Sequence, residues 1–136
     1  MYEEKKDALG RIYATGKRKC AIARVWVSPG TGKFVVNGKE VKNYFMRDSK
    51  TYDASFPLKV INGETNFDVM ATVSGGGLSA QAGAVKLGIS RALTVIDSAY
   101  RGMLKPEKCL VRDARVVERK KYGMKKARKR FQFSKR

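Results

Sequence analysis

The side chains with the clearest chemistry are the cations that crowd the end of the chain. Residues 119–136 hold ten Lys and Arg and no Asp or Glu. Such a run neutralises phosphate groups and releases their counterions, so its affinity falls steeply with salt. A merely solvated extension is the weaker interpretation, because the run would repel itself without a polyanion. We therefore expect a nucleic-acid partner, bound by Arg112, Arg115, Arg119, Lys120, Lys121, Lys125, Lys126, Arg128, Lys129 and Arg130.

A second basic cluster consists of Lys17, Arg18 and Lys19, in a predicted turn between extended segments. Three adjacent cations in a turn suit contact with a phosphate backbone. An exposed polar loop is the alternative interpretation.

The aromatic residues of the tail also leave two interpretations open. Tyr122 and the two phenylalanines at 131 and 133 could stack on unpaired bases, or fold back onto the rest of the chain.

Two glycine-rich segments are similar to phosphate-binding loops. Residues 30–33 (GTGK) lack the spacing of a nucleotide-binding loop and join two predicted strands, which argues against a nucleotide site. Gly75, Gly76 and Gly77 precede a predicted helix, where backbone N–H groups can hold an anion such as an RNA phosphate. Tight strand-to-helix packing would require the same glycines. A small phosphotransferase using this loop is a weaker alternative, because no acidic residue lies nearby to hold magnesium.

The composition argues against most enzyme classes. The chain has 136 residues, 30 Lys plus Arg against 12 Asp plus Glu, a net charge of +18 and no His. His is the usual general base and the commonest metal ligand. Cys20 and Cys109 fit neither a disulfide framework nor paired zinc spacing, so we expect free thiols in a reducing compartment. No signal peptide or membrane-spanning run is apparent. We expect a non-enzymatic intracellular protein with no metal, cofactor, small-molecule substrate or membrane partner.

The charge divides the chain into a foldable body and a basic tail. Residues 1–100 hold 15 basic and 9 acidic side chains, a net of +6, whereas residues 101–136 hold 15 and 3, a net of +12. In the body, alternating apolar residues predict strands over 21–28, 33–36 and 67–73. Apolar residues from Ala82 to Tyr100 recur at helical spacing. Strands followed by a long amphipathic helix indicate an α+β fold.

Other segments are less regular. Val41, Tyr44 and Phe45 predict one or two helical turns, and residues 48–64 receive no assignment because Pro57 and a turn signal interrupt them. Residues 112–121 are rich in helix formers and predict a short helix. Beyond them the tail offers almost nothing for a core, and we expect it to be disordered when free in water.

Three motifs in the same order resemble the family of the ninth protein of the ribosomal small subunit, in its bacterial or organellar type. The first is YATGKRK at 13–19 with AIARV at 21–25, and the second is SGGGLSAQAGA at 74–84 with GISRAL at 88–93. The third is the ending, with RDAR at 112–115, ERKK at 118–121, KAR at 126–128 and QFSKR at 132–136. The resemblance covers nearly everything from Arg11 onward.

This resemblance implies a compact two-layer α+β domain, with a mostly four-stranded sheet and packed helices, similar to the second domain of ribosomal protein five. It implies a left-handed strand–helix–strand crossover, against the usual right-handed rule. The implied organisation is an N-terminal extension at 1–10, a globular RNA-binding body at 11–110 and a basic tail at 111–136. That tail would be extended and ordered only on RNA.

The resemblance also implies partners. The body would bind small-subunit ribosomal RNA beside neighbouring proteins of the head. The tail would bring Ser134, Lys135 and Arg136 to the anticodon stem-loop of the P-site tRNA. The protein would then be a structural component of the ribosome, in a bacterial cytoplasm or an organelle matrix such as that of the mitochondrion. A free RNA chaperone that binds many RNAs through its tail is the alternative.

Overall fold

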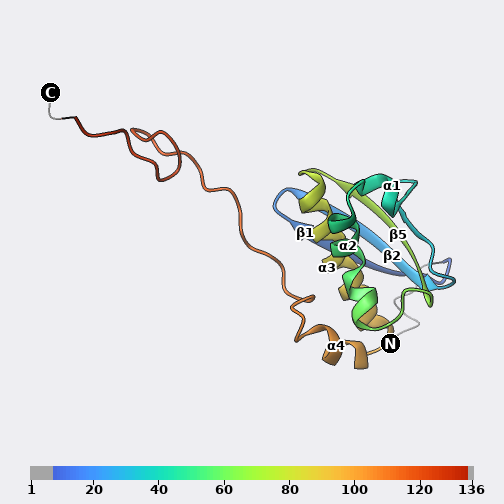
Figure 1. The fold of residues 1–136 in the computed structure, drawn as a ribbon. Coiled ribbons are helices and arrows are strands. Elements are labelled where there is room, and N and C mark those ends of the chain that lie inside the picture. The colour runs from blue at the N-terminus through green and yellow to red at the C-terminus, as the bar shows by residue number, and fades with distance from the viewer. Residues whose placement is uncertain (1–7, 135–136) are drawn as a thin grey trace.

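The computed structural model describes residues 8–134 as an α+β body followed by a long tail (Figure 1). The strands are β1 (Ile12–Arg18), β2 (Ala21–Pro29), β3 (Phe34–Val36), β4 (Lys39–Glu40) and β5 (Phe67–Ser74). The helices are α1 (Val41–Phe45), α2 (Asp48–Val60), α3 (Leu78–Ile96) and α4 (Ala99–Leu104). The expected α+β class is confirmed.

The five strands form one sheet in the order β1-β2-β5-β3-β4. β1 and β2 form a hairpin, and β2 pairs antiparallel with β5. β3 runs parallel to β5, so the chain must cross over between them, and α1 and α2 lie in that crossover. The predicted turn over residues 17–19 is wrong for its first two residues, because Lys17 and Arg18 are the last residues of β1 and pair with β2. Only Lys19, with a left-handed φ of 52°, lies in the β1–β2 turn, so the three basic residues still meet at one end of the hairpin.

The core lies between the sheet and α3. The inward residues of β2, which are Ala21, Ala23, Val25 and Val27, are fully buried together with Ile89 and Leu93 of α3. Two glycines bring the two layers unusually close. A Cβ on Gly16 would lie 1.8 Å from the Ala84 carbonyl oxygen, and one on Gly88 would lie 2.6 Å from a Val25 methyl group. Glycine is therefore required at both positions for α3 to rest on β1 and β2.

Most of the predicted elements are confirmed. The strands at 21–28, 33–36 and 67–73 and the helical turns at 41–45 match β2, β3, β5 and α1. The long helix is also present, but it begins at Leu78 and ends at Ile96, so Tyr100 belongs to α4 instead. The sequence patterns did not predict β1 or α2. The first contains Gly16 and Lys17, which strands disfavour, and the second contains Pro57 and buries few large side chains.

The predicted helix over 112–121 is wrong, because no helix follows Leu104 in the described chain. Helix-forming composition alone is marginal in a segment this short unless an apolar face packs on something. The apolar residues of the segment, Val116 and Val117, are 65% and 84% exposed, so no such packing exists. Asp113 instead turns back on Arg115, accepting hydrogen bonds from its backbone N–H and its guanidinium.

Candidate nucleic-acid interface

The tail leaves the body through an ion-pair cluster around Asp113. Its carboxylate accepts hydrogen bonds from Arg115 Nε at 3.0 Å and Nη2 at 2.8 Å. On its other side the buried Nε of Arg18 lies 3.6 Å from Asp113 Oδ2, within ion-pair range though too far for a hydrogen bond. The hydrogen bonds from Arg115 and the charges of both arginines hold the pKa of Asp113 well below its usual range. One acid thus joins β1 to the root of the tail.

Arg18 reaches this cluster by lying across α3. Its Nη1 donates to the Ser79 carbonyl oxygen at 3.2 Å. A Cβ on Gly83 would lie only 2.5 Å from Arg18 Cδ. The absence of a side chain at Gly83 therefore leaves room for the Arg18 side chain to run over α3. The placement of Arg18 therefore depends on both the strand end and the small residue of the helix.

A basic groove of about 270 Å³ opens beside this cluster. Five cations from the hairpin end, α3 and the tail root line it, against two acids: Lys17, Arg18, Lys86, Lys108 and Arg115 against Asp53 and Asp113. Neither Lys86 nor Lys108 was singled out from the sequence, because each stands alone there. The groove concentrates positive potential on the body itself, so its Lys and Arg side chains can neutralise the negative charge of a phosphate backbone.

Farther out, the tail forms a small basic loop. Glu118 pairs with Lys121 and accepts a hydrogen bond from Arg128 Nε at 2.9 Å, and these partners lower the pKa of the Glu118 carboxyl. Met124 and Arg130 form an isolated antiparallel bridge, with Lys125 N–H donating to the Lys129 carbonyl oxygen at 2.8 Å. The loop thereby presents its cations together at a distance from the body.

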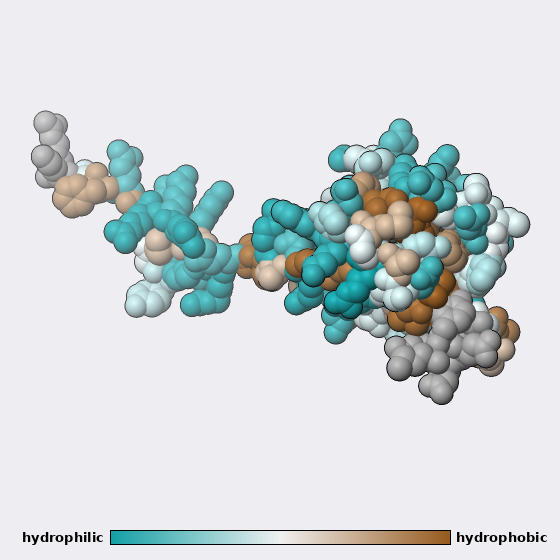
Figure 2. Space-filling model, turned by 90° about the horizontal axis from the view of Figure 1, so that it is seen from below, coloured by the Kyte–Doolittle hydropathy of each residue, from teal (hydrophilic) through white to brown (hydrophobic). Residues whose placement is uncertain are grey.

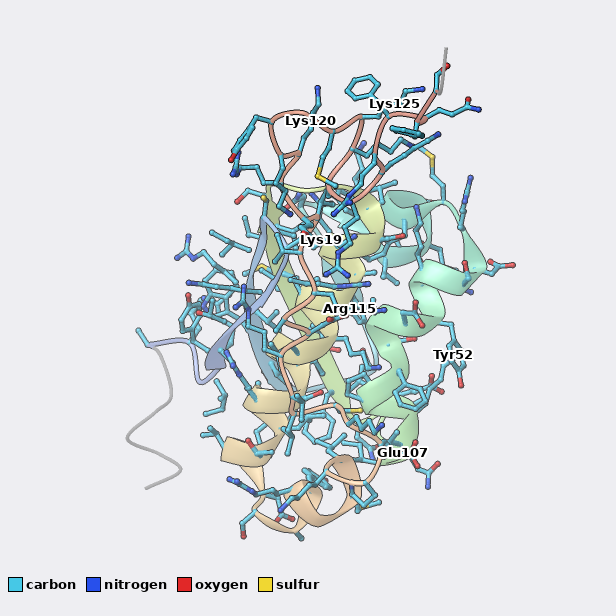
Figure 3. The ribbon with its side chains drawn as sticks, turned by 90° about the vertical axis from the view of Figure 1, so that its left-hand side faces the viewer. Lys19, Tyr52, Glu107, Arg115, Lys120 and Lys125 are labelled. Carbon is cyan, nitrogen blue, oxygen red and sulfur yellow. The ribbon has the colours of Figure 1, made fainter. Side chains whose placement is uncertain are left out.

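The tail is strongly hydrophilic on the face drawn in Figure 2, and the labelled Lys120 and Lys125 lie in its loop in Figure 3. The aromatic side chains are exposed: Tyr122 by 96%, Phe131 by 62% and Phe133 by 84%. Of the two interpretations of these rings, the structure favours the one in which they remain free of the body. Lys125 Nζ lies 5.7 Å from the Phe131 ring centre, a cation–π distance.

The glycine loop before α3 serves packing at two of its three positions. Gly75 and Gly76 have left-handed φ values of 75° and 64°, and Cβ atoms there would meet Cys20 and Ala21 at 2.4 and 3.2 Å. Gly77 has nothing within 4 Å of a Cβ position. The loop lies against the hairpin turn and so is close to Lys19.

Gln81 secures the same loop from inside α3. Its Nε2 donates to the Gly75 carbonyl oxygen at 3.1 Å, and its Oε1 accepts from the Tyr44 hydroxyl at 2.6 Å. These bonds satisfy a side chain that is only 8% exposed. The loop conformation is therefore fixed by a buried polar network that links α1 to α3.

The other glycine-rich segment, at 30–33, binds a carboxylate from the same chain, that of Asp68. Asp68 Oδ1 accepts hydrogen bonds from the backbone N–H groups of Thr31, Gly32 and Lys33 at 2.9, 3.0 and 2.9 Å. These bonds lower the pKa of the Asp68 carboxyl. A Cβ on Gly30 would collide with the same carboxylate at 2.1 Å. The backbone donors that a phosphate would use are thus already occupied.

The predicted basic residues fall into two groups. Lys17, Arg18 and Lys19 lie at the hairpin end near Arg115 and the glycine loop, whereas residues 119–130 lie in the tail beyond (Figure 1). Ser134 is exposed near the far end of the tail, and Lys135 and Arg136 lie outside the described residues. Arg112 is exposed at the tail root. The structure therefore brings the first group together and separates it from the second.

Residues 8–134 contain no group of three or more Cys, Asp or Glu placed to hold a metal ion, and no helix both long and apolar enough to cross a membrane. Cys20 is exposed and Cys109 is buried, both as free thiols. Burial raises the pKa of the Cys109 thiol.

Comparison with known families adds one finding. The family model described as ribosomal protein S9/S16 matches residues 16–136. The matched range begins in β1 and includes the glycine loop, the basic groove and the entire tail.

Proposed function

The chain belongs to the ribosomal protein S9/S16 family, and from that premise we propose that it binds small-subunit ribosomal RNA in the head of the subunit and extends its tail to the P-site tRNA. The observation that carries the proposal is the separation of charge: residues 101–136 hold +12 of the total +18. This distribution of charge suits a folded body that docks on RNA and a basic tail that extends away from that body to a second contact. The role is structural and supplies charge and position rather than catalysis.

Binding to ribosomal RNA is supported by cations at two places. Lys17, Arg18 and Lys86 converge on the basic groove of the body, and the exposed Lys and Arg of 119–130 provide a second contact farther out. Each neutralised phosphate releases counterions, so the two contacts reinforce each other on one polyanion. Asp113 holds the root of the tail to β1 and thereby sets the direction in which the second contact starts.

The tRNA contact is proposed for Ser134, Lys135 and Arg136. It is supported by the family's match through the last residue and by the exposed position of Ser134 in the far part of the tail. Eighteen residues from Arg119 to the end can span about 60 Å when extended, at about 3.3–3.6 Å per residue. That reach suits an arm that crosses RNA to a second ligand.

Fractionation tests the proposal. The full chain should remain on salt-washed small subunits at one copy per subunit and should be absent from large subunits. A free RNA chaperone would wash off or distribute over many RNAs, and that outcome would contradict the proposal. Saturable ATP binding with turnover by the purified chain would instead support a phosphotransferase.

A further inference from the structure

The outward face of the sheet carries a row of exposed and half-buried apolar and aromatic side chains. The register aligns Tyr13 of β1 with Trp26 of β2, Trp26 with Met70 of β5, and Met70 with Val35 of β3. Tyr13 is 44% exposed and Met70 is 40% exposed. The helices lie on the opposite face in Figures 1 and 3, so no helix of residues 8–134 covers this row.

Arginine guanidinium groups flank the two rings. Arg24 lies 5.1 Å from the Trp26 ring centre and 6.0 Å from that of Tyr13, and Arg11 lies 5.5 Å from the Trp26 ring. The rings themselves are 5.4 Å apart and tilted by 51°. The result is a compact set of flat aromatic and cationic groups on a rigid sheet.

Hydrogen bonding helps to hold the rings in place. The Thr15 hydroxyl donates to Tyr13 Oη at 2.9 Å, and with Arg24 it lowers the pKa of the Tyr13 phenol. Thr15 pairs directly with Arg24 across the hairpin. The sheet register therefore fixes Tyr13, Trp26 and Arg24 relative to one another, which reduces the ordering cost of binding a ligand.

The charge of this face favours a polyanion. Arg24 and Lys17 both point outward from the hairpin, and the acids on this face are Asp68 of β5 and Glu40, which pairs with Val35 at the β4 edge. Because Asp68 already accepts three backbone hydrogen bonds, its charge is largely satisfied within the chain. A partner protein would need acidic groups to match the cations. An unpaired nucleic-acid strand offers both phosphates for the cations and bases for the rings.

We propose that this outer face, built on Tyr13, Arg24 and Trp26, is a second RNA site that binds an unpaired segment by stacking its bases on the two rings. The inference rests on the proposed ribosomal role, but Tyr13, Arg24 and Trp26 neither line the basic groove nor belong to the tail, and only Lys17 at the edge of the face is shared with the groove. Duplex RNA cannot supply the contact, because its bases are already stacked on each other. The site therefore adds a preference for unpaired RNA to charge contacts that bind any polyanion.

Trp26 provides a direct probe, because it is the only tryptophan in the chain. The full chain is titrated with a short oligouridylate or oligoadenylate, with duplex RNA of the same charge, and with inorganic polyphosphate. All three ligands will bind the tail. Single-stranded RNA should quench Trp26 fluorescence strongly, and the duplex and polyphosphate should not. Equal quenching by all three, or none while binding continues, would overturn the proposal.

Matched variants then measure the contribution of the rings. Tyr13→Leu should weaken binding of the oligonucleotide by about 5- to 100-fold at a salt concentration that suppresses the tail's contribution. Tyr52→Leu on α2 is the control, since Tyr52 is similarly exposed at 48% and lies outside this face. Arg24→Gln tests the site without removing a ring and should also weaken binding. Wild-type affinity of both Tyr13→Leu and Arg24→Gln would overturn the proposal.

The result of the test of the outer-face site can be distinguished from the result of the test of the ribosomal role. Loss of the outer-face site should leave duplex binding and retention on small subunits unchanged, since the groove and tail are intact. If a neighbouring protein covers this face instead, chemical cross-links from the Lys17 side of the hairpin will reach protein and Trp26 will not respond to RNA. That pattern would refute the second RNA site while leaving the proposed function in place.

Discussion

Gly16 in β1 and Ala84 in α3 approach so closely that a Cβ on Gly16 would lie 1.8 Å from the Ala84 carbonyl oxygen. The obstacle is backbone, so no side-chain rotation can relieve it. Gly88 stands next to the same contact, where a Cβ would lie 3.4 Å from Gly16 N. This contact sets the position of α3 against the strand that ends in Lys17 and Arg18, and so the position of the basic groove.

Gly16→Ala should therefore destabilise the body severely. The added methyl group forces α3 away from β1, and we expect a loss of about 3 kcal/mol or more, at the upper end of overpacking costs. Urea unfolding followed by circular dichroism measures it. Gly102→Ala is the matched control, because a Cβ on Gly102 of α4 meets nothing within 4 Å. It should stabilise the helix by about 0.5–1 kcal/mol, and equal effects of the two substitutions would contradict the packing argument.

Asp113→Asn should loosen the root of the tail. The substitution removes the carboxylate charge that Arg18 and Arg115 share, so the segment will detach more often from β1. Limited trypsin digestion should then cut faster after Arg112 and Arg115, with little change in the stability of the body. Glu107→Gln is the control, since Glu107 forms no ion pair within residues 8–134. Unchanged cleavage in Asp113→Asn would show that the ion pairs do not hold the root.

The same carboxylate predicts a pH dependence. The folded-state pKa of Asp113 is depressed below the usual value, which is about 3.9. Its ion pairs should therefore be complete above that pH and be lost only as the pH falls through the depressed folded value. NMR titration of the Asp113 carboxyl carbon should give a midpoint clearly below 3.9. A midpoint at or above 3.9 would mean that Arg115 and Arg18 do not pair with it in solution.

Asp68→Ala should expose the backbone N–H groups of Thr31, Gly32 and Lys33. We expect a lower melting temperature, because three donors lose their acceptor. Inorganic phosphate should raise the melting temperature of this variant more than that of the wild type, since it can occupy the vacated donors. Asp68→Asn keeps one side-chain oxygen as an acceptor. Its melting temperature and its response to phosphate should therefore lie between those of the wild type and Asp68→Ala. Equal phosphate effects on all three proteins would show that the segment cannot hold an external anion.

How far the sequence predicts the fold depends on how local each signal is. Alternation in β2 and β5 predicts those strands, since one face is buried and the other is not. β1 is stabilised by its pairing with β2 and its contact with α3, and neither is visible in a sequence that includes Gly16 and Lys17. Residues 112–121 show the opposite error: their helix propensity is real, but nothing packs against them.

In the candidate site, too, the sequence reveals local features but not the contacts between distant segments. The basic character of Arg18 and Arg115 is evident from the sequence, as is the glycine-rich nature of 75–77. Their spatial relation is not evident, because Asp113 joins segments that are far apart along the chain. The occupant of the 30–33 loop is equally hidden, since Asp68 lies on another strand. Pairing of Tyr13 with Trp26 also requires the register of a hairpin whose first strand was not predicted.

Deleting residues 119–136 should lower the salt dependence of RNA binding. The deletion removes ten cations, and each phosphate contact contributes about 0.9 to the log–log slope for a duplex or about 0.7 for a single strand. The slope should fall by several units while the groove retains weaker binding. Filter binding over a range of potassium chloride concentrations measures it. An unchanged slope would place the phosphate contacts on the body alone.

The central claim is that the end of the tail holds P-site tRNA, and small subunits whose copy of this chain lacks residues 134–136 test it most directly. Their affinity for P-site tRNA is measured after confirming that the shortened chain occupies the subunits at one copy each. The account predicts normal occupancy with faster tRNA dissociation and weaker binding. Full occupancy with tRNA binding identical to that of the intact chain would contradict it.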